Sequence, residues 1–98
     1  MTAESLRIHN LEDLRRYVHE AICYLNELEV NVFNITERIL VRGGEPCGIL
    51  FCLHGPRSVK LTAVWETERN TILFYGSSGQ RTHRTCLVAA PVLQPQAA

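Results

Sequence analysis

The chain has 98 residues and a mass of 11.1 kDa, and its ten Lys and Arg residues balance ten Asp and Glu residues. A net charge of zero excludes a polycationic protein that wraps nucleic acid and an acidic solvating protein, although a local charged patch remains compatible with it. The apolar share of 46% and the charged share of 20% indicate a globular domain, and no apolar stretch reaches the roughly 20 residues that a membrane span needs.

The N-terminal segment shows no clear periodicity, and we expect residues 1–9 to be a frayed lead-in. It also lacks the apolar core of a signal peptide, which favours a cytoplasmic protein with no membrane partner. In that compartment cysteines are normally reduced thiols. The chain has four of them: Cys23, Cys47, Cys52 and Cys86.

An amphipathic helix is predicted over residues 11–28. Asn10 is a suitable N-cap, and Asp13 lies in the first turn, where an acidic side chain interacts favourably with the helix dipole. Apolar side chains recur every three or four residues on one face: Leu11, Leu14, Val18, Ala21, Ile22, Leu25 and Leu28. Cys23 belongs to the opposite, polar face, so the pattern predicts that it is exposed.

After the helix, the spacing of apolar residues becomes that of β-strands. Residues 30–35 fit either a short edge strand or an extended connector. Five further segments have strand composition and are bounded by turns: residues 38–41, 47–53, 59–66, 71–75 and 81–88. The last eight residues, 91–98, are rich in Pro, Gln and Ala and are expected to form a disordered tail.

The turns between these strands have about three to six residues, which favours antiparallel neighbours because a parallel crossover needs about a dozen or more. We therefore predict one α+β domain over residues 1–90. Its fold is one N-terminal amphipathic helix followed by a four- to five-stranded antiparallel meander sheet.

One helix covers only one face of such a sheet, yet the predicted strands carry apolar side chains toward both faces. Placing Phe51 under the helix leaves Leu50 and Cys52 on the other face, together with Val64. A contiguous apolar face is typical of an interface, and two-fold homo-oligomers are the commonest way to cover one. We therefore predict a homo-oligomeric interaction or accessory module without catalysis of its own, the dimer being favoured. Alternatively, residues 30–37, the tail or an apolar ligand cover this face.

Basic residues gather in the later part of the chain. Residues 1–29 contain three Arg and six acidic residues, whereas residues 30–98 contain seven basic and four acidic residues. This asymmetry supports an alternative function, binding of an anion or a nucleic acid.

The residues that would carry this alternative lie in or next to two turns, 54–58 and 76–81; they are His54, Arg57, Arg81 and Arg84. The turn amides and the arginines would contact phosphates if both turns lie at the same end of the sheet. Trp65 or Tyr75 would then offer a stacking platform.

Residue types with catalytic or metal-binding chemistry do not form a known motif. Cys52-x-His54 and His83-x-x-Cys86 have the ligand types of a zinc site, but His83 and Cys86, three residues apart on a strand, point in opposite directions. We therefore predict no metal and no other cofactor, and we assign no catalytic residue. A small enzyme that uses His54, His83 and a cysteine is the third hypothesis.

Overall fold

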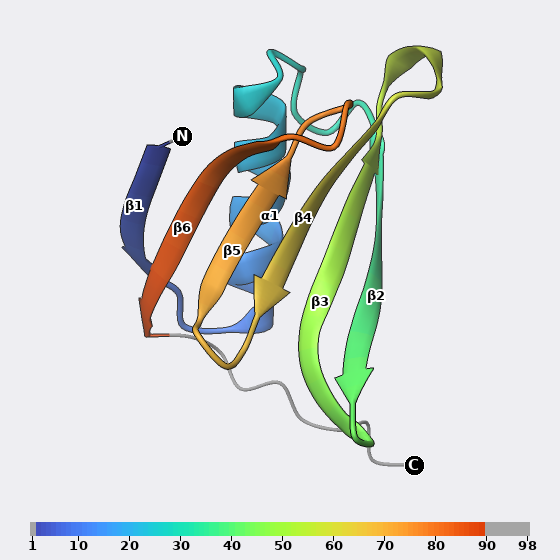
Figure 1. The fold of residues 1–98 in the computed structure, drawn as a ribbon. Coiled ribbons are helices and arrows are strands. Elements are labelled where there is room, and N and C mark those ends of the chain that lie inside the picture. The colour runs from blue at the N-terminus through green and yellow to red at the C-terminus, as the bar shows by residue number, and fades with distance from the viewer. Residues whose placement is uncertain (1, 90–98) are drawn as a thin grey trace.

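The structure, a computed structural model, describes residues 2–89, with the backbone alone at residues 2–5 and 89 (Figure 1). Its elements in chain order are β1 (Thr2–Arg7), α1 (Leu11–Leu25), β2 (Asn34–Arg42), β3 (Glu45–His54), the short 3₁₀ segment η1 (Pro56–Ser58), β4 (Lys60–Glu66), β5 (Thr71–Tyr75) and β6 (Arg81–Ala89). The strands form one sheet in the order β1-β6-β5-β4-β3-β2, and α1 packs on one face of it. The prediction of the α+β class with an N-terminal helix is confirmed.

The sheet differs from the predicted four- to five-stranded antiparallel meander in strand number and direction. Six strands are described, and β1 pairs with β6 in parallel, whereas all other neighbours are antiparallel. The prediction of a frayed lead-in at residues 1–9 is wrong, because Thr2–Arg7 forms an edge strand. Its hydrogen-bonding partner is β6, near the other end of the chain. The tail predicted at 91–98 lies outside the described residues.

Helix α1 begins where the sequence predicts. The side chain of Asn10 accepts a hydrogen bond of 2.8 Å from the backbone N–H of Asp13, which satisfies one of the unpaired amides of the first turn. Among the described residues, no helix has the length and hydrophobicity needed to cross a membrane.

The helix ends at Leu25 and not at residue 28 as predicted. Glu27 follows in the left-handed region with a φ of 55°, and the N–H of Leu28 donates to the carbonyl of Cys23 over 2.8 Å. The N–H of Glu27 donates to the carbonyl of Tyr24 over 3.4 Å. These two bonds form a Schellman motif in which Glu27 occupies the position usually held by glycine.

The core lies between α1 and the sheet face beneath it. Trp65, Phe51 and Phe74 are the largest fully buried side chains. Tyr17 of α1 contacts Phe74 edge to face, with 6.3 Å between ring centroids, and its hydroxyl shares a 2.6 Å hydrogen bond with the hydroxyl of Thr85. These two contacts tie the helix to β5 and β6.

Cys23 is buried, with 0% of its surface exposed, so the prediction that it is exposed is wrong. The chain turns back after Leu25, and the Sγ of Cys23 lies 3.9 Å from the carbonyl oxygen of Glu29. A helical wheel misses this cover, because it comes from the segment beyond the helix.

Cysteine labelling tests this packing. Cys52 is half-buried at the sheet surface, and we expect it to react with a maleimide well before Cys23 in the native protein. Burial also raises the pKa of the Cys23 thiol, which lowers the fraction of reactive thiolate near neutral pH. Peptide mapping after timed labelling of dilute protein measures the order; equal rates at Cys23 and Cys52 would contradict the packing.

Candidate functional site

The face of the sheet that points away from α1 is the strongest candidate surface, and no described element covers it (Figure 1). We call it the open face. Side chains alternate along each central strand, so the neighbours of the buried core residues lie here. The structure places Leu50, Cys52 and Val64 on this face, each half-buried, together with Leu73 and Tyr75.

Strand pairing sets three apolar residues side by side at the centre of the open face. Leu50 lies opposite Val64, and Val64 lies opposite Leu73. In the same row, Arg38 on β2 and Arg84 on β6 flank these three residues, and both arginines are exposed. The row continues beyond Arg84 to Ala3 of the edge strand β1, and we call the part from Arg38 to Arg84 the central row. Neighbouring strands lie about 4.8 Å apart, so this central row spans about 20 Å. It has an apolar middle and a guanidinium group at each end.

Tyr75 lies in the adjacent row, opposite Thr62 on one side and Arg81 on the other. The guanidinium carbon of Arg81 is 5.7 Å from the centre of the Tyr75 ring, and its Nη2 donates to the Tyr75 hydroxyl over 3.4 Å. Trp65, by contrast, is completely buried on the α1 side. The prediction that Trp65 offers a stacking platform is therefore wrong, and Tyr75 remains available at this face.

The rim of the open face is basic. Arg38, Lys60, Arg81 and Arg84 occupy exposed positions on it, while Glu66 is the one acidic residue at its described strand positions. In the part of the chain with described side chains, none of these four basic residues forms a salt bridge. Their charges are therefore free to act on an external partner.

The turns at 54–58 and 76–81 lie at the same end of the sheet (Figure 1), because β3 and β5 both run antiparallel to β4. The Nε2 of His54 lies 3.1 Å from the hydroxyl of Thr36, so this imidazole is partly engaged. Arg57 and Ser58 have φ values of 57° and 63°, and the N–H of Val59 donates to the carbonyl of Pro56 over 3.1 Å. Together they form a turn of type I′, which normally contains Asn or Gly. This turn projects the exposed Arg57 from the end of the sheet.

The residue types of the zinc hypothesis are not brought together. Cys52, His54 and Cys86 lie on the open-face side of their strands, whereas His83 is buried on the other side with its ring 5.6 Å from that of Phe74. Among the described residues, no three His, Cys, Asp or Glu side chains form a cluster that fits a metal ion.

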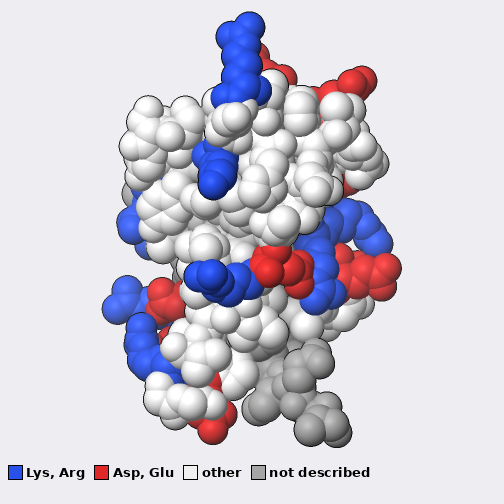
Figure 2. Space-filling view, turned by 90° about the vertical axis from the view of Figure 1, so that its right-hand side faces the viewer, with Lys and Arg blue, Asp and Glu red and all other residues white. Residues whose placement is uncertain are grey.

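Sequence reasoning missed a cleft of about 370 Å³ between α1 and the β2 edge. Three of its charged groups are engaged within the molecule: Arg15 forms a bidentate pair with Glu37 at 2.9–3.0 Å, and Arg16 lies 3.4 Å from Asp13, whereas Glu20 also lines the cleft and is exposed. Figure 2 shows charged groups of both signs in a band across this side of the molecule. Only the folded chain brings these elements together, so no local signal reveals the cleft. The cleft offers fewer unpaired charges to an external partner than the open face does.

Comparison of the chain with protein-family models, with curated proteins and with solved structures found no match. We therefore infer the function from the geometry and charge of the open face.

Proposed function

We propose that the protein is a small homo-oligomeric interaction module of the cytoplasm, that the open face of its sheet is the interface, and that the chain has no catalysis of its own. The observation that carries this proposal is the central row, in which Leu50, Val64 and Leu73 lie side by side without a cover from the described chain. A contiguous apolar patch of this kind usually marks an interaction site. The four unpaired cysteines are in keeping with a reducing compartment.

The composition of the open face also supports an interface. Tyr and Arg are enriched at protein–protein interfaces, where they often dominate the binding energy. Tyr75 and Arg81 form a stacked pair next to the central row, and Arg38 and Arg84 flank that row. An apolar centre with a charged rim is the usual anatomy of such a surface.

A matched pair of variants tests this proposal. Leu73→Asp places a charge in the centre of the open face, and we expect association to weaken by about 100-fold or more because a hydrated carboxylate then replaces an apolar contact at the centre of the interface. Ile39→Asp is the control: Ile39 is 41% exposed and lies on the α1 side of the edge strand β2. Sedimentation velocity measures both, with circular dichroism to verify folding.

The expected result is a folded monomer for Leu73→Asp and wild-type association for Ile39→Asp. Wild-type association by a folded Leu73→Asp variant would overturn the proposal, because the interface would then lie elsewhere.

A second candidate function is binding of an anion or a nucleic acid. The observation that favours it is the common location of the two turns, which sets the exposed Arg57 and Arg81 at one end of the sheet. Binding of a fluorescent single-stranded RNA is then expected to weaken steeply with salt, and Arg81→Ala with Arg84→Ala should reduce the salt slope by about 2. Absence of binding at low salt would contradict this function.

A further inference from the structure

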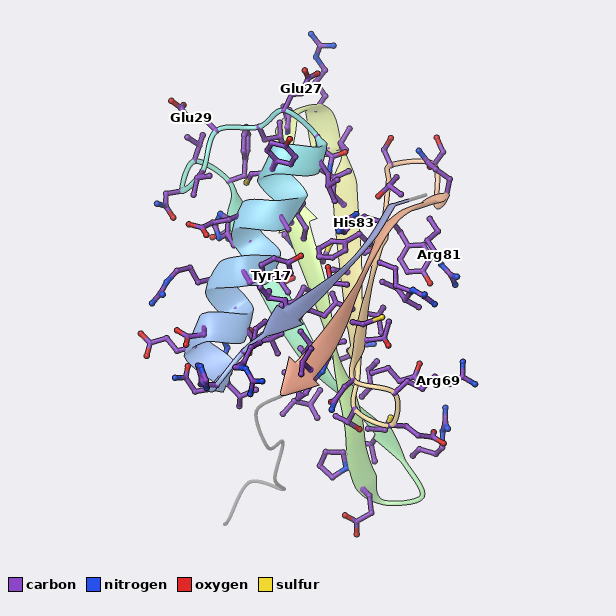
Figure 3. The ribbon with its side chains drawn as sticks, turned by 90° about the vertical axis from the view of Figure 1, so that its left-hand side faces the viewer. Tyr17, Glu27, Glu29, Arg69, Arg81 and His83 are labelled. Carbon is purple, nitrogen blue, oxygen red and sulfur yellow. The ribbon has the colours of Figure 1, made fainter. Side chains whose placement is uncertain are left out.

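The end of α1 and the segment after it form a second exposed surface, which is acidic and apolar. Tyr24 is 84% exposed, and Val32 is 57% exposed. The same stretch of the chain, residues 20–32, carries three exposed carboxylates, those of Glu20, Glu27 and Glu29. We call these five residues the Tyr24 ridge. Figure 3 shows Glu27 and Glu29 on the helix side of the molecule, opposite Arg69 and Arg81 on the sheet side.

The acidic residues of the ridge conflict with their local structure. Glu27 adopts a left-handed φ of 55° at a position where glycine is usual. A carboxylate at the C-terminal end of a helix also opposes the helix dipole, and the last turn of α1 has no basic residue. Within the described side chains, Glu27 and Glu29 form no salt bridge. Glu27 and Glu29 therefore destabilise the end of the helix, and no salt bridge among the described side chains offsets this cost. Such destabilising residues are expected at a surface that binds a partner.

The charge of the open face conflicts with a contact between two open faces. Its basic residues lie on three sides: Arg38 toward β2, Arg81 and Arg84 along β6, and Lys60 toward the turn end. Two such faces in contact would oppose like charges, with Glu66 as the one acidic residue at a described strand position. An acidic surface with an apolar centre fits the open face better, and the Tyr24 ridge has both properties.

We propose that the Tyr24 ridge of one copy docks on the open face of the next copy, in a head-to-tail contact. This inference rests on the proposed function and names the surface that covers the open face. Tyr24 packs on the central row, while Glu27 and Glu29 pair with the arginines at its ends. Because the two contacting surfaces differ, an open assembly keeps one free ridge at one end and one free open face at the other until it closes into a ring.

Two variants that each remove one surface test this contact. The ridge variant carries Tyr24→Ala with Glu27→Ala, and the face variant carries Arg38→Glu with Arg84→Glu. All four positions are exposed, so both variants are expected to fold. Glu12→Ala is the control, since Glu12 is an exposed acidic residue in the first turn of the same helix.

Each variant alone is expected to be a monomer, and an equal mixture is expected to form a complex of one chain of each kind and nothing larger. In that mixture only the ridge of the face variant and the open face of the ridge variant remain competent. Native mass spectrometry with one variant labelled with ¹⁵N identifies the complex. The Glu12→Ala variant should associate as the wild type does.

The outcomes separate this inference from the proposed function. If the face variant is monomeric but the ridge variant associates normally, the open face is the interface and the head-to-tail contact is wrong. If both are monomeric and the mixture stays monomeric, the head-to-tail contact is also wrong. Normal association by both variants would overturn the inference and the proposed function together.

Discussion

Replacing Gly48 by alanine is expected to destabilise the fold by about 3 kcal/mol or more. A Cβ at this position would overlap the backbone carbonyl oxygen of Trp65. Gly48 pairs with Glu66 between two central strands, so the clash is relieved only if β3 and β4 move apart. No side chain rotation relieves it, because the opposing atom belongs to the backbone.

Urea unfolding measured by circular dichroism tests this prediction, and Gly55→Ala is the matched control. At Gly55 the nearest atom to an added Cβ would be 3.5 Å away, which is an ordinary contact, and the φ of −81° suits any residue. The control should therefore change stability by less than about 1 kcal/mol. A Gly48→Ala variant as stable as the control would contradict the pairing of β3 with β4 at this register.

Removing the Trp65 side chain is the second change with a large expected effect. Trp65 is completely buried between α1 and the sheet, so Trp65→Ala is expected to cost about 3–5 kcal/mol through lost contacts and the cavity left behind. Trp65→Phe should cost much less. The indole Nε1 is buried and has no hydrogen-bond partner among the described residues, so its loss leaves no polar group unpaired.

Far-ultraviolet circular dichroism during urea titration compares the two variants, since Trp65 is the only tryptophan and its fluorescence disappears in both. A loss for Trp65→Phe as large as that for Trp65→Ala would contradict an unpaired indole. It would indicate instead that the Nε1 hydrogen contributes a bond of its own.

The parts of the fold that local patterns determine are predictable from the sequence. Asn10 and Asp13 mark the helix start, and alternation of apolar and polar residues marks the central strands, because these signals depend on near neighbours. Strand β1 could not be predicted from the sequence, because TAESLR has no alternating pattern and its pairing partners lie near the other end of the chain. The burial of Cys23 was missed for a similar reason: its cover comes from the segment beyond the helix.

The composition of the candidate site is likewise predictable from the sequence only in part. That Leu50 and Cys52 share one face follows from the two-residue period of a strand, and Val64 joins them because its neighbours Ala63 and Trp65 belong to the core face. Which arginines join them depends on register. A bulge at Phe74/Tyr75 brings Arg81 opposite Tyr75, where regular pairing would place Thr82. No local sequence signal predicts that bulge, so the composition of the rim required the folded chain.

The mass of the wild-type protein in solution tests most directly whether the open face is an interface. Sedimentation equilibrium from about 1 to about 100 µM is the suitable measurement, because association depends on concentration. We expect an average mass above the 11.1 kDa of one chain that rises with concentration. A mass of one chain across the whole range would contradict it.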